Sequence, residues 1–264
     1  MEATIASGPN KARLLYNTVT GALFARGAVR NDLNTIGKRY NLRWVAGSRG
    51  KPGINADIQN AAEAVRMIAD PDFELLGTNA VTADAAYYVE GGITIGSHGA
   101  DLDSTILLPH LDANQTPWSV VTWGTDKETV WECDITTGTI TTAVIWAGLK
   151  LTNTPTIATD DNQVFFRYEN GVSSGVWVVA SSIANVDTST VTTVTVAAST
   201  RYHLRIAIDS ARRATCYING VVVFTSAALT DAVDLIPYIG VKASGVAAVR
   251  SIVVHGQAIS RVIG

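Results

Sequence analysis

The chain has 264 residues, of which 47% are hydrophobic and 16% charged, and its formal net charge is −3 at pH 7. This composition excludes a disordered chain, and the length allows one large β domain or two smaller domains. No stretch approaches the roughly 18 uninterrupted apolar residues of a membrane span. Residues 1–21 also lack the apolar core and cleavage site of a secretory signal. We therefore expect no membrane partner.

The first 54 residues are basic, whereas the rest of the chain is acidic. Residues 1–54 carry a charge of +7 and residues 55–264 a charge of −10. Gly and Pro residues interrupt this basic segment, so no regular apolar period survives in it. It nevertheless keeps apolar anchors that a disordered tail would lack. We predict an extended arm over 1–54 that becomes ordered on an acidic partner surface. A solvated basic loop is the alternative interpretation.

Aromatic side chains of this arm would anchor it to a partner, while its bases would steer the encounter. The predicted docking residues are Lys11, Arg13, Tyr16, Phe24, Arg26, Arg30, Lys38, Arg39, Arg43, Trp44, Arg49 and Lys51. The stretch "GSRGKPG" lacks the spacing of a phosphate-binding loop. We therefore expect no specific nucleic-acid partner.

Residues 55–70, "NADIQNAAEAVRMIAD", place apolar side chains at helical spacing on one face. Asn55 can cap the start of a helix, and Pro71 would end it. The pattern predicts one amphipathic helix over 55–70.

From Phe73 onward the pattern is that of β-strands. Short segments rich in Val, Ile, Thr and aromatic residues follow one another, each bounded by Gly, Asn, Asp or Pro. Such strands without helices between them predict an all-β, antiparallel two-sheet sandwich over residues 71–264. No internal repeat indicates a propeller or a solenoid.

Residues 201–225, "RYHLRIAIDSARRATCYINGVVVFT", show the clearest alternation. Tyr202, Leu204, Ile206 and Ile208 point one way and predict an inward face. Asn219-Gly220 predicts a type I′ hairpin turn, because both central residues of that turn need a positive φ. We interpret this stretch as scaffold that carries no site.

The order of these hairpins resembles the carboxy-terminal part of concanavalin A-like (laminin G-like) jelly rolls. The matching residues are Tyr202, Leu204, Ile206, Asp209, Tyr217, Ile218, Asn219, Gly220, Val223, Pro237 and Tyr238. The resemblance implies a jelly roll, a fold that hosts lectins, glycosidases and inert structural modules. Residues 103–138 and 156–171 also resemble virion proteins of tailed phages. That resemblance implies a capsid decoration or cement role.

One strand segment, "KETVWECDI", carries carboxylates that would share a face if it is extended: Glu128, Glu132 and Asp134. Retaining glycosidases need two carboxyl groups about 5 Å apart. The glycosidase pattern of this fold is Glu-x-Asp-x-x-Glu, but its last position here is Thr137. Because the acid that would protonate the leaving group is missing, we interpret this face as a solvated polar surface and predict no enzyme activity.

Four residues are candidate calcium ligands. Asp101, Asp103, Asp112 and Asn114 supply oxygen atoms of the kind that Ca²⁺ prefers, but they match no calcium-loop spacing and could equally cap turns. His98, His110, His203 and His255 show no metal-ligand spacing. Cys133 and Cys216 lie in apolar strand patterns and are interpreted as buried thiols. We predict no metal and no cofactor.

We also expect the Trp residues within strands to fill the core, although exposed ones would stack sugars. The leading hypothesis is a non-enzymatic phage capsid decoration protein that the arm clamps to the major capsid protein. It would be a homo-oligomer, with a trimer suggested by analogy, on the capsid exterior after assembly in the host cytoplasm. The alternative is a carbohydrate-binding receptor-recognition module of a tail fibre or spike, with a host-surface glycan as its ligand.

Overall fold

The computed structural model describes residues 39–48, 50–54, 72–109, 116–151 and 160–263. It also describes the backbone of four short strands: β1 (Glu2–Thr4), β2 (Arg13–Tyr16), β3 (Leu23–Arg26) and β4 (Thr35–Ile36). Strands β1, β2 and β3 form a small antiparallel sheet of their own. The helix predicted over 55–70 lies outside the described residues.

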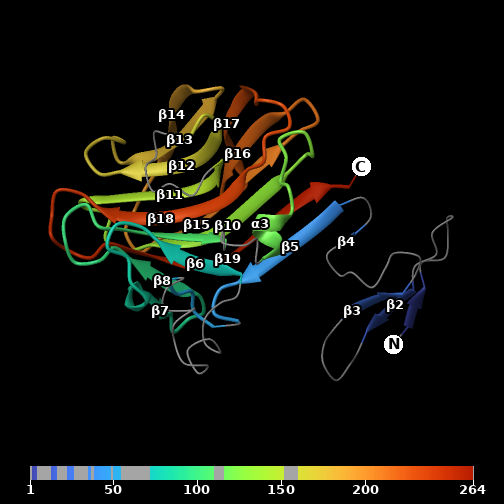
Figure 1. Ribbon diagram of the computed structural model, residues 1–264, viewed down its shortest axis with the longest axis horizontal. Coiled ribbons are helices and arrows are strands. Elements are labelled where there is room, and N and C mark those ends of the chain that lie inside the picture. Colours follow the sequence, from blue (N-terminus) through green and yellow to red (C-terminus); the bar gives the residue numbers. More distant parts are fainter. Residues whose placement is uncertain are drawn as a thin grey trace.

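Two antiparallel sheets form a sandwich (Figure 1). We call the first the front sheet. Its strands, in spatial order, are β17 (Val221–Ala228), β16 (Arg213–Ile218), β15 (Arg201–Ile208), β10 (Val130–Thr137), β19 (Ser251–Val262), β5 (Arg39–Val45) and β4. Strand β8 (Ile93–Gly96) pairs with another part of β19, and β7 (Ala85–Tyr87) pairs with β8.

The second sheet is called the back sheet. Its strands, in spatial order, are β14 (Val186–Thr195), β13 (Val176–Ile183), β12 (Gln163–Glu169), β11 (Ala143–Lys150), β18 (Ile236–Ala243), β9 (Ser104–Pro109) and β6 (Phe73–Leu76). Two short helices occur in the described connections, η1 (Thr82–Asp84) and α3 (Pro117–Val120). The predicted all-β two-sheet sandwich is confirmed. No helix among the described residues is long and apolar enough to cross a membrane.

The core lies between the sheets and follows from strand alternation. In β10, Trp131, Cys133 and Ile135 are buried, while Glu132 and Asp134 on the other face are only partly covered. All six Trp side chains are at most 2% exposed, as predicted for the strand tryptophans. Five of them lie in the core between the sheets, whereas Trp146 is buried with Tyr238 in a second apolar cluster on the outward face of the back sheet.

The hairpins predicted over 201–225 are present. Tyr202, Leu204, Ile206 and Ile208 are at most 3% exposed and face the core. Asn219 and Gly220 have φ angles of 51° and 80°, the positive values that a type I′ turn requires. Strand parity therefore predicted this part of the core correctly.

The predicted arm boundary at residue 54 is wrong for residues 39–48 and 50–54, which the structure describes as part of the sandwich. Strand β5 pairs antiparallel with β19 inside the front sheet (Figure 1). Trp44 is 2% exposed and packs on Phe73 with ring centroids 4.8 Å apart, so it cannot anchor a partner. Lys51 Nζ donates hydrogen bonds to the carbonyl oxygens of Thr82 and Ala85. These residues belong to the sandwich because their apolar side chains complete its core.

The outward face of the back sheet carries a buried ion pair. Lys150 Nζ lies 3.6 Å from Asp160 Oδ2, and their side chains are 0% and 1% exposed. The ammonium also lies 4.6 Å from the centre of the Tyr238 ring. Burial lowers the pKa of Lys150, and the charge of Asp160 opposes that shift.

Candidate binding trough on the front sheet

The outward face of the front sheet is hollowed along β19. Gly256, Ala258 and Ser260 are small residues that form its floor, and strands β5 and β10 flank them. Because neighbouring strands lie about 4.8 Å apart, β5 and β10 stand roughly 10 Å apart. We call this hollow the trough. Its larger part has a volume of about 850 Å³ and its smaller part, beside Asp134 and His255, about 250 Å³.

Strand register explains why the trough has walls. Arg43 lies opposite Ala258, Ala258 opposite Glu132, Glu132 opposite Arg205 and Arg205 opposite Tyr217. Residues in such a row share one face of the sheet. In this row the small Ala258 forms the floor of the trough. The long side chains of Arg43 on one side and Glu132 on the other form its walls.

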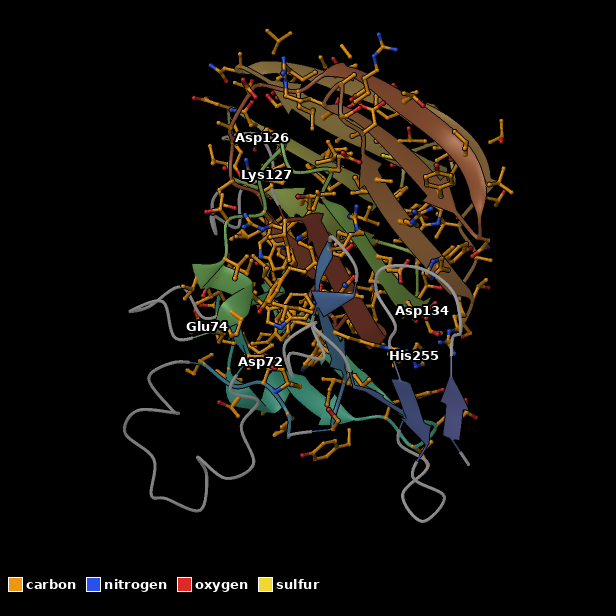
Figure 2. All side chains as sticks on the ribbon, turned by 90° about the vertical axis from the view of Figure 1, so that its right-hand side faces the viewer. Asp72, Glu74, Asp126, Lys127, Asp134 and His255 are labelled. Atoms are coloured by element: carbon orange, nitrogen blue, oxygen red, sulfur yellow. The ribbon has the colours of Figure 1, made fainter. Side chains whose placement is uncertain are left out.

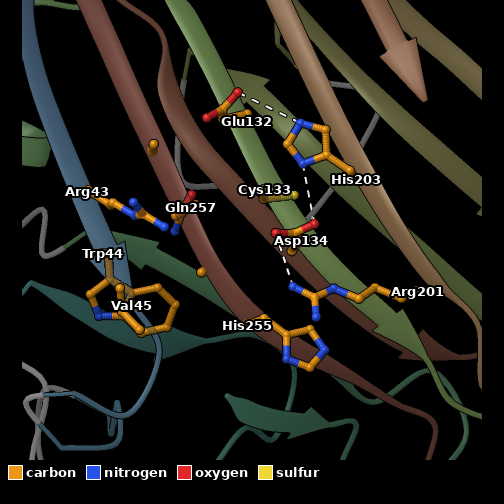
Figure 3. A pocket seen from close by; sticks show the side chains of 12 residues that line it. Arg43, Trp44, Val45, Glu132, Cys133, Asp134, Arg201, His203, His255 and Gln257 are labelled. Carbon is orange, nitrogen blue, oxygen red and sulfur yellow. Dashed lines mark hydrogen bonds and ion pairs between the residues drawn. The ribbon is translucent and has the colours of Figure 1, made fainter. Parts of the chain in front are cut away.

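The wall on the β10 side is an ion-pair network (Figure 3). His203 stands between two carboxylates, with Nδ1 3.3 Å from Asp134 Oδ1 and Nε2 3.8 Å from Glu132 Oε2. An Arg201 guanidinium nitrogen lies 3.2 Å from Asp134 Oδ2. The side chains of this network are 37–58% exposed, so it is open to a ligand.

Arg205 lies between this network and an aromatic ring. Its Nε lies 4.0 Å from Glu132 Oε2, and its guanidinium carbon lies 5.0 Å from the centre of the Tyr217 ring. Within that distance a cation is attracted to the ring face. The Arg205 guanidinium therefore lies over one face of the Tyr217 ring, and both residues line one side of the trough.

At the other end, His255 is fixed by two hydrogen bonds. The register between β10 and β19 shifts between Asp134 and Ile135, which leaves His255 unpaired in a bulge. Its Nδ1 donates to the Gly91 carbonyl at 2.7 Å, so its Nε2 can accept from the Thr136 hydroxyl at 2.9 Å. Figure 2 shows His255 and Asp134 on one side of the molecule, well away from Asp126 and Lys127.

The carboxylate pattern of a retaining glycosidase is incomplete. Glu132 and Asp134 share the trough wall, but Thr137 is 1% exposed and donates to the carbonyl oxygens of Ala197 and Thr200. Glu128 does not join them on the strand as expected, because β10 begins at Val130 and Glu128 has a φ of 48° in the preceding turn. The strand therefore presents two carboxylates and no third.

The weak calcium candidates that the structure describes act as turn caps. Asp101 Oδ1 accepts from the amides of Leu102, Gly245 and Val246. Asp103 accepts from the Asn79 amide group and the Ala100 amide, and these bonds lower its pKa. Asp112 and Asn114 lie outside the described residues. In the described part of the chain, no cluster of three or more His, Cys, Asp or Glu side chains could hold a metal ion.

The predicted docking residues fall into two groups. The structure describes the first group, Arg39, Arg43, Trp44 and Lys51. The Arg39 guanidinium donates hydrogen bonds to Ser260 Oγ and to the Glu128 carbonyl, and Arg43 is exposed beside the trough. Trp44 and Lys51 are held in the sandwich as described above. The side chains of the others lie outside the described residues: Lys11, Arg13, Tyr16, Phe24, Arg26, Arg30, Lys38 and Arg49.

Sequence reasoning missed half of the trough. Arg201, His203 and Arg205 alternate with the core residues of β15, in a stretch that we interpret from the sequence as scaffold without a site. Strand parity identifies His203 and Arg205 as outward-facing. It could not show that Glu132 and Asp134 lie on the neighbouring strand.

Two antiparallel sheets packed face to face form a jelly-roll sandwich, a fold that the chain shares with concanavalin A-like proteins such as peanut lectin. The sequence profile of the family "SO2946-like, C-terminal domain" matches residues 120–254, just over half of the chain. The chain belongs to this family. No curated protein matches it in sequence.

Solved structures share the fold at low identity. The protein of unknown function SO2946 from Shewanella oneidensis MR-1 is 13% identical with a TM-score of 0.56, over 88% of this chain and 91% of that chain. A structure from work on mucin-degrading endo-acting O-glycanases of the human gut microbiota is 5% identical with a TM-score of 0.54, over 73% and 92%. Peanut lectin is 11% identical with a TM-score of 0.50, over 85% and 97%. These likenesses establish the fold alone.

Proposed function

We propose that the protein is a non-enzymatic glycan-binding module and that the trough on the front sheet is its binding site. The observation that supports this most is the shape of the trough. A floor of small residues on β19 lies between two walls of hydrogen-bonding side chains roughly 10 Å apart. Its volume of about 850 Å³ falls within the range of about 300–1,000 Å³ typical of ligand sites.

The chemistry of the walls suits a sugar. Carboxylates and imidazoles accept or donate hydrogen bonds to hydroxyl groups, and the partly exposed Tyr217 ring offers apolar surface to a sugar beside the Arg205 guanidinium. The half-exposed state of Glu132 and His203 leaves these groups within reach of a ligand. Peanut lectin, which shares the fold, is by name a lectin.

A glycan array followed by calorimetry on the best ligand tests this proposal. We expect binding that Tyr217→Ala weakens at least tenfold, because the apolar surface of the ring is lost. Tyr87→Ala removes an exposed tyrosine outside the trough, at 57% exposure, and is the matched control. Absence of binding across the array, or equal losses in the two variants, would overturn the proposal.

The non-enzymatic part of the proposal rests on Thr137. Its position would need a carboxylic acid for retaining hydrolysis, and its hydroxyl is buried and hydrogen-bonded. We expect no release of reducing sugar from any glycan that binds. Release that Glu132→Gln abolishes would show that the protein is an enzyme.

In a virion, such a module would engage a host-surface glycan. A second function, capsid decoration, is favoured by the charge of residues 1–38, which carry five Lys or Arg residues against two acids. This segment would attach the sandwich to the major capsid protein by charge attraction. Reversal to Glu at Lys11, Arg13, Arg26, Arg30 and Lys38 should abolish co-sedimentation with capsids. Unchanged co-sedimentation would exclude docking through this segment.

A further inference from the structure

The trough is positively charged on a protein that is otherwise negative. Its charged lining consists of Arg39, Arg43, Arg201 and Arg205 with Glu132 and Asp134. With neutral histidines this lining carries +2, so the rest of the chain carries −5, because the whole chain carries −3. A site of this sign raises the local concentration of anionic ligands.

The two carboxylates in the trough are already paired, so they do not repel an anion strongly. Asp134 has Arg201 at 3.2 Å and His203 at 3.3 Å. Glu132 Oε2 has His203 at 3.8 Å and Arg205 at 4.0 Å. Each negative charge is matched by a neighbouring base on β15.

Arg43 is different from the other arginines. Arg39 donates to Ser260 and Glu128, Arg201 pairs with Asp134, and Arg205 lies over Tyr217. The guanidinium of Arg43 makes no hydrogen bond or ion pair with any residue that the structure describes, and it extends from β5 over β19 (Figure 3).

We infer that the trough binds an anionic glycan and that Arg43 pairs with its carboxylate or sulfate group. The inference deepens the proposed function and rests on it. A guanidinium presents a planar fork of N–H donors that matches a carboxylate or a sulfate in two parallel hydrogen bonds. The small Ala258 in the same row leaves room for a sugar ring between Arg43 and Glu132.

The test compares ligands that differ in charge alone. The 264-residue protein is titrated with a panel of uronate-containing and sulfated oligosaccharides, each beside its carboxyl-reduced or desulfated form. We expect the charged form to bind and its neutral partner to bind at least tenfold more weakly. The affinity of the charged form should fall as ionic strength rises. The uronate and sulfate arms separate the two kinds of acidic group.

Arg43→Gln should weaken binding of the charged ligand about tenfold to a hundredfold, the range expected for one charge-assisted pair. Arg43→Lys keeps the charge but loses the fork, and it should recover part of the loss. Lys127→Gln removes the same charge away from the trough, where Lys127 pairs with Asp126, and it should leave affinity unchanged.

Three outcomes would count against the inference in different ways. Equal binding of charged and neutral forms would overturn the anionic ligand but keep the glycan-binding function. A preference for charge that Arg43→Gln does not reduce would overturn the role of Arg43. No binding of any glycan would overturn the proposed function and this inference with it.

Discussion

The imidazole of His203 and the carboxylate of Asp134 meet across two neighbouring strands, with Nδ1 3.3 Å from Oδ1. The pair exists because β15 and β10 place these residues directly opposite each other on the outward face. Their side chains are 40% and 37% exposed. Solvent therefore screens the contact, which orients the wall of the trough more than it stabilises the fold.

Replacing Asp134 by Asn should change the free energy of unfolding by less than about 1 kcal/mol, because ion pairs at this exposure contribute little. Urea denaturation of the wild type and the variant measures the difference. A loss above about 2 kcal/mol would mean that the network supports the sheet and is not simply a surface feature.

The same substitution at the buried pair should act differently. Asp160→Asn removes the carboxylate 3.6 Å from Lys150 Nζ, where both side chains are fully buried. A buried ammonium deprived of its carboxylate costs about 3–5 kcal/mol. Urea denaturation should show this loss beside the small effect of Asp134→Asn. Adding Lys150→Met should recover part of the loss, because no buried charge of the pair then remains, and a strictly additive double variant would contradict this account.

The alternation of apolar and polar residues along the strands predicts which side chains of residues 201–225 lie in the core. It placed Tyr202, Leu204, Ile206 and Ile208 in the core, and the structure agrees. The same alternation is present in β5. Leu42 and Trp44 are buried there, and they alternate with Asn41 and Arg43, which face outward. The many glycines nearby and the excess of Arg hid this strand, so it was assigned to the arm.

The trough itself could not be predicted from the sequence. Glu132 lies opposite Arg205 on one side and Ala258 on the other, although these residues are far apart in the chain. Only the strand order of the sheet brings them together. A single sequence shows which residues face outward but not which strands are neighbours, so the small residues of β19 carried no visible signal.

Alkaline pH should destabilise the protein through its buried thiols. Burial raises the pKa of both Cys133 and Cys216 above their ordinary value of 9.0. The folded state therefore keeps protons that the unfolded chain releases above pH 9, and stability falls as pH rises past that value. Each thiol contributes a slope of up to about 1.4 kcal/mol per pH unit.

Unfolding free energies of wild type and Cys216→Ala between pH 8 and 10 test this expectation. The smaller Ala side chain can change the unfolding free energy by the same amount at every pH, so the comparison is between slopes. The unfolding free energy of Cys216→Ala should fall less between pH 8 and 10 than that of the wild type. Both thiols should also resist a thiol reagent in the folded protein, since the Cys133 and Cys216 side chains are buried. Parallel pH profiles, or rapid labelling of the native state, would contradict it.

Filling the floor of the trough should weaken glycan binding without unfolding the protein. Ala258→Ile adds three carbon atoms between Arg43 and Glu132 on a partly exposed strand position, and the β-branched side chain suits a strand. We expect the free energy of unfolding to change by no more than about 0.5 kcal/mol, as for surface substitutions generally. Glycan affinity should fall at least tenfold. Val222→Ile adds bulk at an exposed position of β17 beyond Tyr217, at 54% exposure, and should leave affinity unchanged. If Ala258→Ile binds as tightly as Val222→Ile, the ligand does not lie on β19, because a ligand seated there must contact the added side chain.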